Sequence, residues 1–159
     1  MFRIRTATLE DLRYIMQFEG KLFDMHYAFD TYYGLYEDYV NLEEFLLAQM
    51  ERCGNDRLYL VAENEAGEII GFASASAIII PDSDAPRVGR LLSIFVLEEY
   101  RRRGIGKALR EGRIAWLSMC QVDYIETGIN PHNTSMLAHI KKDGFTEYMI
   151  IFKKKISNR

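Results

Sequence analysis

A strand that runs into a glycine-containing basic turn, with a helix directly after it, constrains the fold of this chain most. The apolar run LLSIFVL ends at Leu97 and predicts a buried strand over 90–97. Apolar residues at helical spacing predict a helix over Ile105–Met119, and Gly104 and Gly106 mark its start. This order of elements is typical of α/β proteins.

The turn has the composition of an anion-binding site. Glycines let the backbone bend tightly and let an anion approach the free N–H groups of the first helical turn. The helix dipole favours negative charge at the same place. The basic residues of the turn are Arg101, Arg102, Arg103 and Lys107. We therefore expect a ligand that carries a diphosphate; the alternative is a glycine-bearing turn with solvated charges.

Two well-known phosphate motifs are absent from this turn. A P-loop requires Ser or Thr after the lysine, but Ala108 follows Lys107, and Arg101 stands where the first glycine is required. A dinucleotide-binding GxGxxG motif also fails, because its third glycine position holds Leu109.

The rest of the chain predicts a mixed sheet. Further strands are expected over 2–5, 57–63, 68–80, 124–129 and 145–155, and further helices from Thr8 to about 23, from Asn41, and over Thr134–Lys142. The hairpin of the second and third strands, together with two strand–helix–strand crossovers, implies a mixed sheet with helices on both faces. No repeat or linker divides residues 1–159, so we expect one domain.

Composition excludes several classes of protein. The chain has 159 residues, of which 48% are hydrophobic and 27% charged, as in globular domains. The net charge of −3 argues against a nucleic-acid partner. No apolar run approaches the ~20 residues that span a bilayer, and no signal peptide is recognisable. Because Cys53 and Cys120 are isolated, we expect reduced thiols, no metal and a cytoplasmic location.

One region of the sequence is both acidic and aromatic. Between Lys21 and Arg52 there are seven carboxylates (Asp24, Asp30, Glu37, Asp38, Glu43, Glu44 and Glu51), and five tyrosines (Tyr27, Tyr32, Tyr33, Tyr36 and Tyr39) lie among them. Carboxylates and aromatic faces suit a cationic amine. The candidate substrate residues are His26, Asp30, Tyr32 and Tyr33. The alternative is that the tyrosines pack a lid or a homodimer contact while the acids are solvated.

Two motifs resemble those of the GNAT N-acetyltransferase superfamily. Arg101-x-x-Gly104-x-Gly106 resembles its R/Q-x-x-G-x-G/A signature, and Asn133 followed by Gly144-Phe145 resembles its N-x(10)-G-F block. The resemblance runs from the first predicted strand to the end of the chain. It implies an α/β fold with a mostly antiparallel mixed sheet of six to seven strands, a central strand splay and helices on both faces.

The resemblance also implies acetyl-CoA as co-substrate, bound in the splay between the strands at 90–97 and 124–129. Phe95 and Val96 would pair with its pantetheine arm, and Asn133 would contact the pantetheine or adenosine side. The residues implied for the pyrophosphate are Arg101, Arg102, Arg103, Gly104, Ile105, Gly106 and Lys107. The implied reaction is direct attack of a primary amine of a small molecule on the thioester in a ternary complex.

The catalytic residues are left open by the sequence. Many family members carry a tyrosine seven residues after the asparagine as general acid, but Ile140 stands there. His139 beside it and Glu126 are candidates for proton transfer. The alternatives to a small-molecule enzyme are a non-catalytic acyl-CoA-binding sensor or interaction module, and an acetyltransferase for protein N-termini or lysines.

Overall fold

The computed structural model describes residues 1–29, 41–80, 84 and 86–154. These form two compact units, Met1–Gly128 and Ile129–Arg159, which we describe separately.

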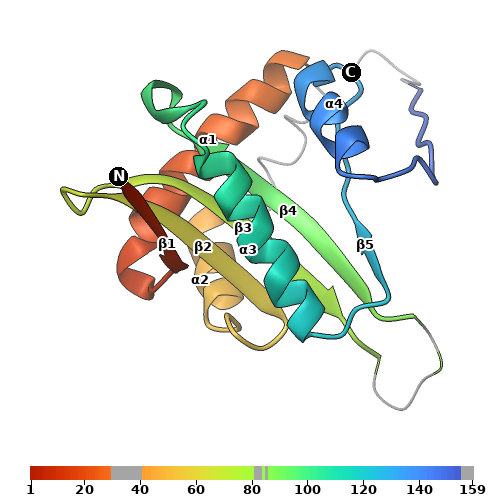
Figure 1. Ribbon diagram of the computed structural model, residues 1–159, viewed down its shortest axis with the longest axis horizontal. Coiled ribbons are helices and arrows are strands. Elements are labelled where there is room, and N and C mark those ends of the chain that lie inside the picture. Colours follow the sequence, from red (N-terminus) through yellow and green to blue (C-terminus); the bar gives the residue numbers. More distant parts are fainter. Residues whose placement is uncertain (30–40, 81–83, 85, 155–159) are drawn as a thin grey trace. The chain divides into compact units, whose positions relative to one another are not determined.

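The first unit is built on one mixed sheet of five strands (Figure 1). The strands are β1 (Phe2–Thr6), β2 (Arg57–Asn64), β3 (Ile69–Ile78), β4 (Val88–Val96) and β5 (Tyr124–Glu126), in the spatial order β1-β2-β3-β4-β5. The pairs from β1 to β4 are antiparallel, whereas β5 runs parallel to β4. The predicted mixed and mostly antiparallel sheet is therefore confirmed.

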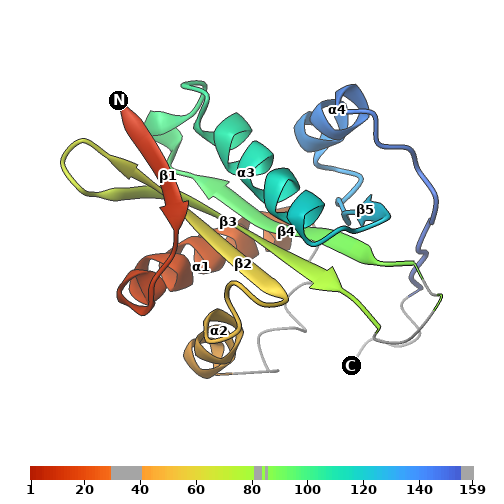
Figure 2. The ribbon, with the colours of Figure 1, turned by 60° about the horizontal axis from the view of Figure 1, so that its bottom comes forward.

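Helices cover both faces of this sheet, as predicted. Helices α1 (Leu12–Phe29) and α2 (Leu42–Met50) lie on one face, and α3 (Ile105–Met119) lies on the other (Figure 2). The buried side chains of α1 are Ile15, Phe18 and Leu22, whose spacing places them on one helical face. No helix within the described ranges is both long and apolar enough to cross a membrane.

A capping sequence, Thr8 with Asp11 three residues later, starts the first helical segment. The Thr8 N–H donates to the Asp11 carboxylate at 2.8 Å, in a short 3₁₀ turn that leads into α1. Arg5 adds two hydrogen bonds to the same carboxylate, at 2.6 and 2.9 Å. Burial opposes ionisation of Asp11, but the bonds from Arg5 and Thr8 outweigh it, so its pKa lies below the ordinary value. Helix α1 extends beyond the predicted end near 23.

Two predicted strands are corrected by the structure. The strand predicted over 124–129 extends only over 124–126 (β5), and the described residues 145–154 contain no strand, so the described part of the chain forms five strands where six to seven were expected. The five apolar side chains at 148–152 are 59–89% exposed. An apolar run becomes a strand only where a neighbouring strand takes its N–H and C=O groups, and the run itself does not supply that neighbour.

The second unit contains α4 (Thr134–Lys142), which confirms the helix predicted there. The Asn133 side chain caps it, because its Oδ1 accepts a hydrogen bond from the backbone N–H of Met136 at 3.2 Å.

Candidate active site

The turn between β4 and α3 has an open backbone. Gly104 adopts a φ of 86°, a left-handed conformation that side chains rarely take, and it is the N-cap residue of α3. Around Gly104 and Gly106, a Cβ atom would meet no other heavy atom within 4 Å. The first N–H groups of α3 are therefore open to a ligand at this end of the helix.

The basic side chains of this turn are exposed, and several are oriented by neighbours. Arg101 donates from Nε to the carbonyl oxygen of Val96 at 3.0 Å, and its guanidinium lies 5.8 Å from the centroid of the Phe95 ring. The guanidinium of Arg103 lies 5.3 Å from the ring centroid of Tyr100. The structure thus brings three of the residues predicted for CoA, Phe95, Val96 and Arg101, into contact.

Strand β4 leaves β5 soon after the two strands pair. The register runs from Val88 opposite Tyr124 to Arg90 opposite Glu126. One more bond follows, from the hydroxyl of Thr127 to the carbonyl of Leu91 at 3.1 Å. Among the described strands, none pairs with residues 92–96 of β4 on this side. The gap is the predicted strand splay, and it exposes main-chain groups of β4 next to the turn.

A bulge in β4 lies at the start of this gap. Ala73 pairs with Ile94 but Ala75 pairs with Leu91, so β4 has one more residue than β3 here. The Ser93 N–H donates to the hydroxyl oxygen of Ser74 at 3.2 Å.

On the face that α3 covers, the bulge meets Arg113 of this helix, which is only 3% exposed. Its guanidinium donates to the carbonyl oxygens of Ser74 at 3.2 Å and Ser93 at 3.3 Å, and so holds the two sides of the bulge together. Burial, with a smaller effect of nearby Arg110, lowers the pKa of Arg113 to about 10.

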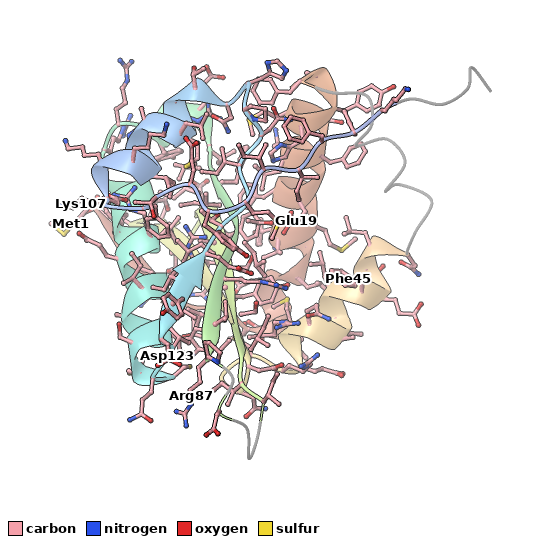
Figure 3. The ribbon with its side chains drawn as sticks, turned by 90° about the vertical axis from the view of Figure 1, so that its right-hand side faces the viewer. Met1, Glu19, Phe45, Arg87, Lys107 and Asp123 are labelled. Atoms are coloured by element: carbon pink, nitrogen blue, oxygen red, sulfur yellow. The ribbon has the colours of Figure 1, made fainter. Side chains whose placement is uncertain are left out.

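The opposite face of the bulge carries a carboxylate, Glu19 of α1 (Figure 3). Burial raises the pKa of Glu19, and the nearby Ser93 hydroxyl opposes this shift. Burial and the neighbouring Glu19 charge together raise the pKa of Tyr59 to about 12. Glu19 thus lies near Ser93 of β4 and Tyr59 of β2, on the side of the sheet that α1 covers (Figure 2).

Glu19 is not among the site residues predicted from the sequence, although the sequence contains a signal for it. Glu19 follows Ile15 by four residues and precedes Leu22 by three, so it belongs to the buried stripe of α1. A carboxylate on such a stripe is a candidate for function, because burying a charge without a partner is unfavourable.

The two residues predicted for proton transfer, Glu126 and His139, belong one to each unit. Glu126 of β5 forms an ion pair with Arg90 of β4. In the second unit, Nδ1 of the exposed His139 donates to the carbonyl oxygen of Ser135 at 2.7 Å, next to the partly buried Ile140. The described residues hold no group of three or more His, Cys, Asp or Glu that suits a metal ion.

The predicted substrate residues are only partly described. The ring of His26 on α1 lies edge-on to that of Phe29, with 6.5 Å between centroids, and burial lowers its pKa. Asp30, Tyr32 and Tyr33 lie outside the described residues.

The fold and site define a class of protein: an α/β protein with an anion-accepting strand–turn–helix beside an open strand edge. Residues 22–145 match the model of the acetyltransferase (GNAT) family. The chain belongs to this family, which confirms the resemblance seen in its motifs.

The individual relatives match only part of the chain, or match it at low sequence identity. The chain is 37% identical to L-2,4-diaminobutyric acid acetyltransferase of Halomonas elongata over 73 residues, which are 46% of this chain and 36% of that protein. The chain thus matches only about a third of that relative's length. A solved structure of aminoglycoside N-acetyltransferase AAC(6')-Iy in complex with CoA is similar, with a TM-score of 0.70, 23% identity, and 99% of this chain and 96% of that chain covered. A mutant of a Bacillus halodurans protein has a TM-score of 0.77 at 20% identity, with 98% and 99% covered. These two likenesses show the fold.

Proposed function

We propose that this protein transfers the acetyl group of acetyl-CoA to a primary amine of a small cationic molecule, by direct attack in a ternary complex. The observation that carries the proposal is the position of the open turn before α3, soon after the part of β4 that has no partner strand on the β5 side. Membership of the acetyltransferase family supports the type of reaction.

The turn fits the diphosphate of CoA. The first N–H groups of α3 are open, and the absence of side chains at Gly104 and Gly106 lets a phosphate reach them. Arg102, Arg103 and Lys107 add exposed positive charge. Arg101 serves by holding the turn to the carbonyl of Val96, next to Phe95.

The open edge of β4 fits the pantetheine arm. An extended chain with amide groups can replace a missing strand by pairing with main-chain N–H and C=O groups. Residues 92–96 of β4 offer such groups on the side that β5 leaves. An N–H on this edge is also a fixed donor for the thioester oxygen, where negative charge develops during attack. In this proposal Asn133 contacts CoA through its side-chain amide while its Oδ1 caps α4.

The choice of a small cationic acceptor rests on charge. The sequence around α1 and α2 is acidic and aromatic. Glu19 adds a largely buried carboxylate beside β4. Two of the similar proteins are named a diaminobutyric acid acetyltransferase and an aminoglycoside N-acetyltransferase, and such amines carry positive charge.

A second candidate function is binding of acyl-CoA without catalysis. The observation that favours it is Ile140, which has no proton to give where many family members carry a tyrosine. Binding of CoA without release of its thiol, with every amine tested, would identify such a module.

The test of the proposed function measures thiol release from acetyl-CoA and the mass of the acetylated product. The acceptors are putrescine, L-2,4-diaminobutyrate, kanamycin, glucosamine 6-phosphate and a lysine-containing peptide. We expect turnover with the small cationic amines. Turnover with the peptide alone would instead assign the protein to the acetyltransferases of proteins.

A matched pair of variants tests the turn. Gly104→Val introduces a side chain where φ is 86° and should abolish CoA binding, measured by calorimetry. Gly54→Val introduces the same strain at φ 92°, in a turn outside the proposed site, and should keep the CoA affinity of the wild type. Retained CoA binding in Gly104→Val would contradict the phosphate role of the turn.

A further inference from the structure

The bulge in β4 decides which main-chain groups of this strand face the open edge. In a strand, the N–H and C=O groups of one residue point to one side, and those of the next residue point to the other. Before the bulge, the carbonyl oxygen of Leu91 accepts a hydrogen bond from Thr127 at 3.1 Å, so Leu91 faces the side of β5. Odd-numbered residues of β4 therefore face this side before the bulge.

Beyond the bulge the order is reversed. The N–H of Leu97 donates to the carbonyl oxygen of Ile70 in β3 at 3.0 Å, so Leu97 faces β3. Val96, one residue earlier, therefore faces the open edge, and so does Ile94. The Arg101 side chain already donates to the carbonyl oxygen of Val96. The extra residue of the bulge thus brings the N–H groups of Ile94 and Val96 to the open edge.

Arg113 of α3 holds this bulge by side-chain hydrogen bonds. In a regular antiparallel pair, main-chain N–H groups of the facing strand donate to the carbonyl oxygens. In the bulge, a single guanidinium nitrogen of Arg113 donates to the carbonyl oxygens of both Ser74 and Ser93, at 3.2 and 3.3 Å. The Ser93 N–H donates to the hydroxyl of Ser74 instead of to a carbonyl. Side chains thus replace the main-chain ladder where the strand changes register.

This arrangement is unfavourable for the stability of the sheet. Arg113 is 3% exposed, and its Nε has no hydrogen-bond partner among the described residues. Burial of a guanidinium group opposes its charge, and a buried donor without an acceptor adds a further penalty. The lowered pKa of Arg113 reflects the first of these effects. A regular strand pair needs no donor from a helix, so a sheet with a merely structural role would avoid both the bulge and the buried arginine.

We propose that Arg113 is a positioning residue for the acetyl-CoA site: its hold on the bulge keeps the N–H groups of Ile94 and Val96 at the open edge, where they donate to the pantetheine arm and the thioester. The inference rests on the proposed function and adds to it the residue of α3 that fixes these donors. Donors of this kind act only when they are already in place, since a displacement of about 1 Å can lower a rate about 10²-fold. Arg113 acts through the main chain and not by contact with the ligand.

The first experiment measures two affinities by calorimetry, at a temperature where wild type, Arg113→Met and Arg113→Lys are folded. The probes are CoA and 3′-phospho-ADP, which carries the phosphates of CoA but no pantetheine arm and therefore reports on the turn alone. Arg113→Met removes the donors, so its affinity for CoA should fall about tenfold while its affinity for 3′-phospho-ADP stays that of the wild type. Arg113→Lys keeps a charged donor and should recover most of the affinity for CoA.

The second experiment measures turnover at saturating acetyl-CoA with putrescine as acceptor. Arg113→Met should lose about 10²-fold in kcat, because the N–H donors no longer meet the thioester oxygen in the right place. Its KM for putrescine should stay near that of the wild type, since these donors act on the thioester and not on the amine. Arg113→Lys should recover most of kcat.

Amide resonances of isotope-labelled protein locate the effect. In the wild type, CoA should shift the amide resonances of Ile94 and Val96. In Arg113→Met without a ligand, these two resonances should already differ from those of the wild type, whereas the resonances of Gly104 and Gly106 in the turn should not change.

Leu117→Val is the matched control for lost stability. Leu117 is a fully buried residue of the same helix and lies next to Gly89 of β4, before the bulge. The variant loses one buried methylene group and should be less stable, with wild-type affinities and kcat. If Leu117→Val loses CoA affinity and kcat as Arg113→Met does, the effect comes from lost stability and the inference is wrong.

The remaining outcomes also decide. An Arg113→Met variant with wild-type CoA affinity and kcat overturns the inference, and so does one that loses affinity for both probes alike. If Arg113→Met does not fold, Arg113→Gln, which is too short to reach both carbonyl oxygens, replaces it and should show the same difference between the probes. If the wild type binds CoA but releases no thiol with any amine, the proposed function fails, and the two affinities and the amide resonances still test the role of Arg113. If the wild type does not bind CoA, both fail.

Discussion

The two faces of β4 each meet a buried charge, and the two charges are held in different ways. On the α3 face, Arg113 is 3% exposed and donates to two main-chain carbonyls of the bulge. On the α1 face, Glu19 lies near the Ser93 hydroxyl and is partly exposed. Arg113 is part of the frame of the sheet, although its buried Nε has no hydrogen-bond partner among the described residues, whereas Glu19 has only a neutral hydroxyl near it. Burial alone therefore does not show how a charge is held; its partners do.

The largest effect on stability should come from Arg113. Arg113→Met keeps most of the side-chain volume but removes the donors to the carbonyls of Ser74 and Ser93. Each buried acceptor left without a donor costs about 1–3 kcal/mol, and relief of the buried charge offsets part of this loss. We expect a lower urea midpoint for Arg113→Met. An unchanged midpoint would show that the bulge holds without Arg113.

The Arg5–Asp11 pair offers an intermediate case, a buried carboxylate with a cation. Asp11→Asn should lower stability by about 1–2 kcal/mol at neutral pH, because it removes an acceptor of the helix start and the ion pair.

The pH dependence of this pair has a definite sign. Because the pKa of Asp11 is lowered in the folded state, its stabilisation is present above the ordinary aspartate pKa of about 4 and is lost as pH falls below it. Thermal melts of wild type and Asp11→Asn should converge in that acidic range. A gap that persists in acid would contradict the ionic part of this account.

The smallest effect on stability should come from Glu19→Gln, which should raise the stability instead of lowering it. Since the pKa of Glu19 is raised in the folded state, the protein is stabilised by its protonated form in acid and loses that stability as pH rises through the folded pKa. Glu19→Gln removes this loss, so we expect a small rise in Tm at neutral pH and none in acid. A lower Tm at neutral pH would place Glu19 with Arg113 among the structural charges.

Local features of the molecule were predictable from the sequence. The capping residues Thr8 and Asp11, the left-handed Gly104 and the helix that follows it depend on neighbours within a few positions. The motif around Gly104 also indicated the acetyltransferase family, which the family model confirms. Helix and turn geometry are short-range properties, and a single segment carries the information for them.

The sequence by itself determined the strand–turn–helix unit, the mixed α/β class and the family. Only the tertiary structure decided that Arg113 closes the β4 bulge, that Glu19 faces Ser93, and that residues 145–154 form no strand. Each of these depends on which distant segment lies opposite. Helical periodicity shows that Glu19 is on an inner face, but the contact with Ser93, 74 positions away, exists only after α1 packs on the sheet. Burial of a charge and its remaining partners are set by that packing.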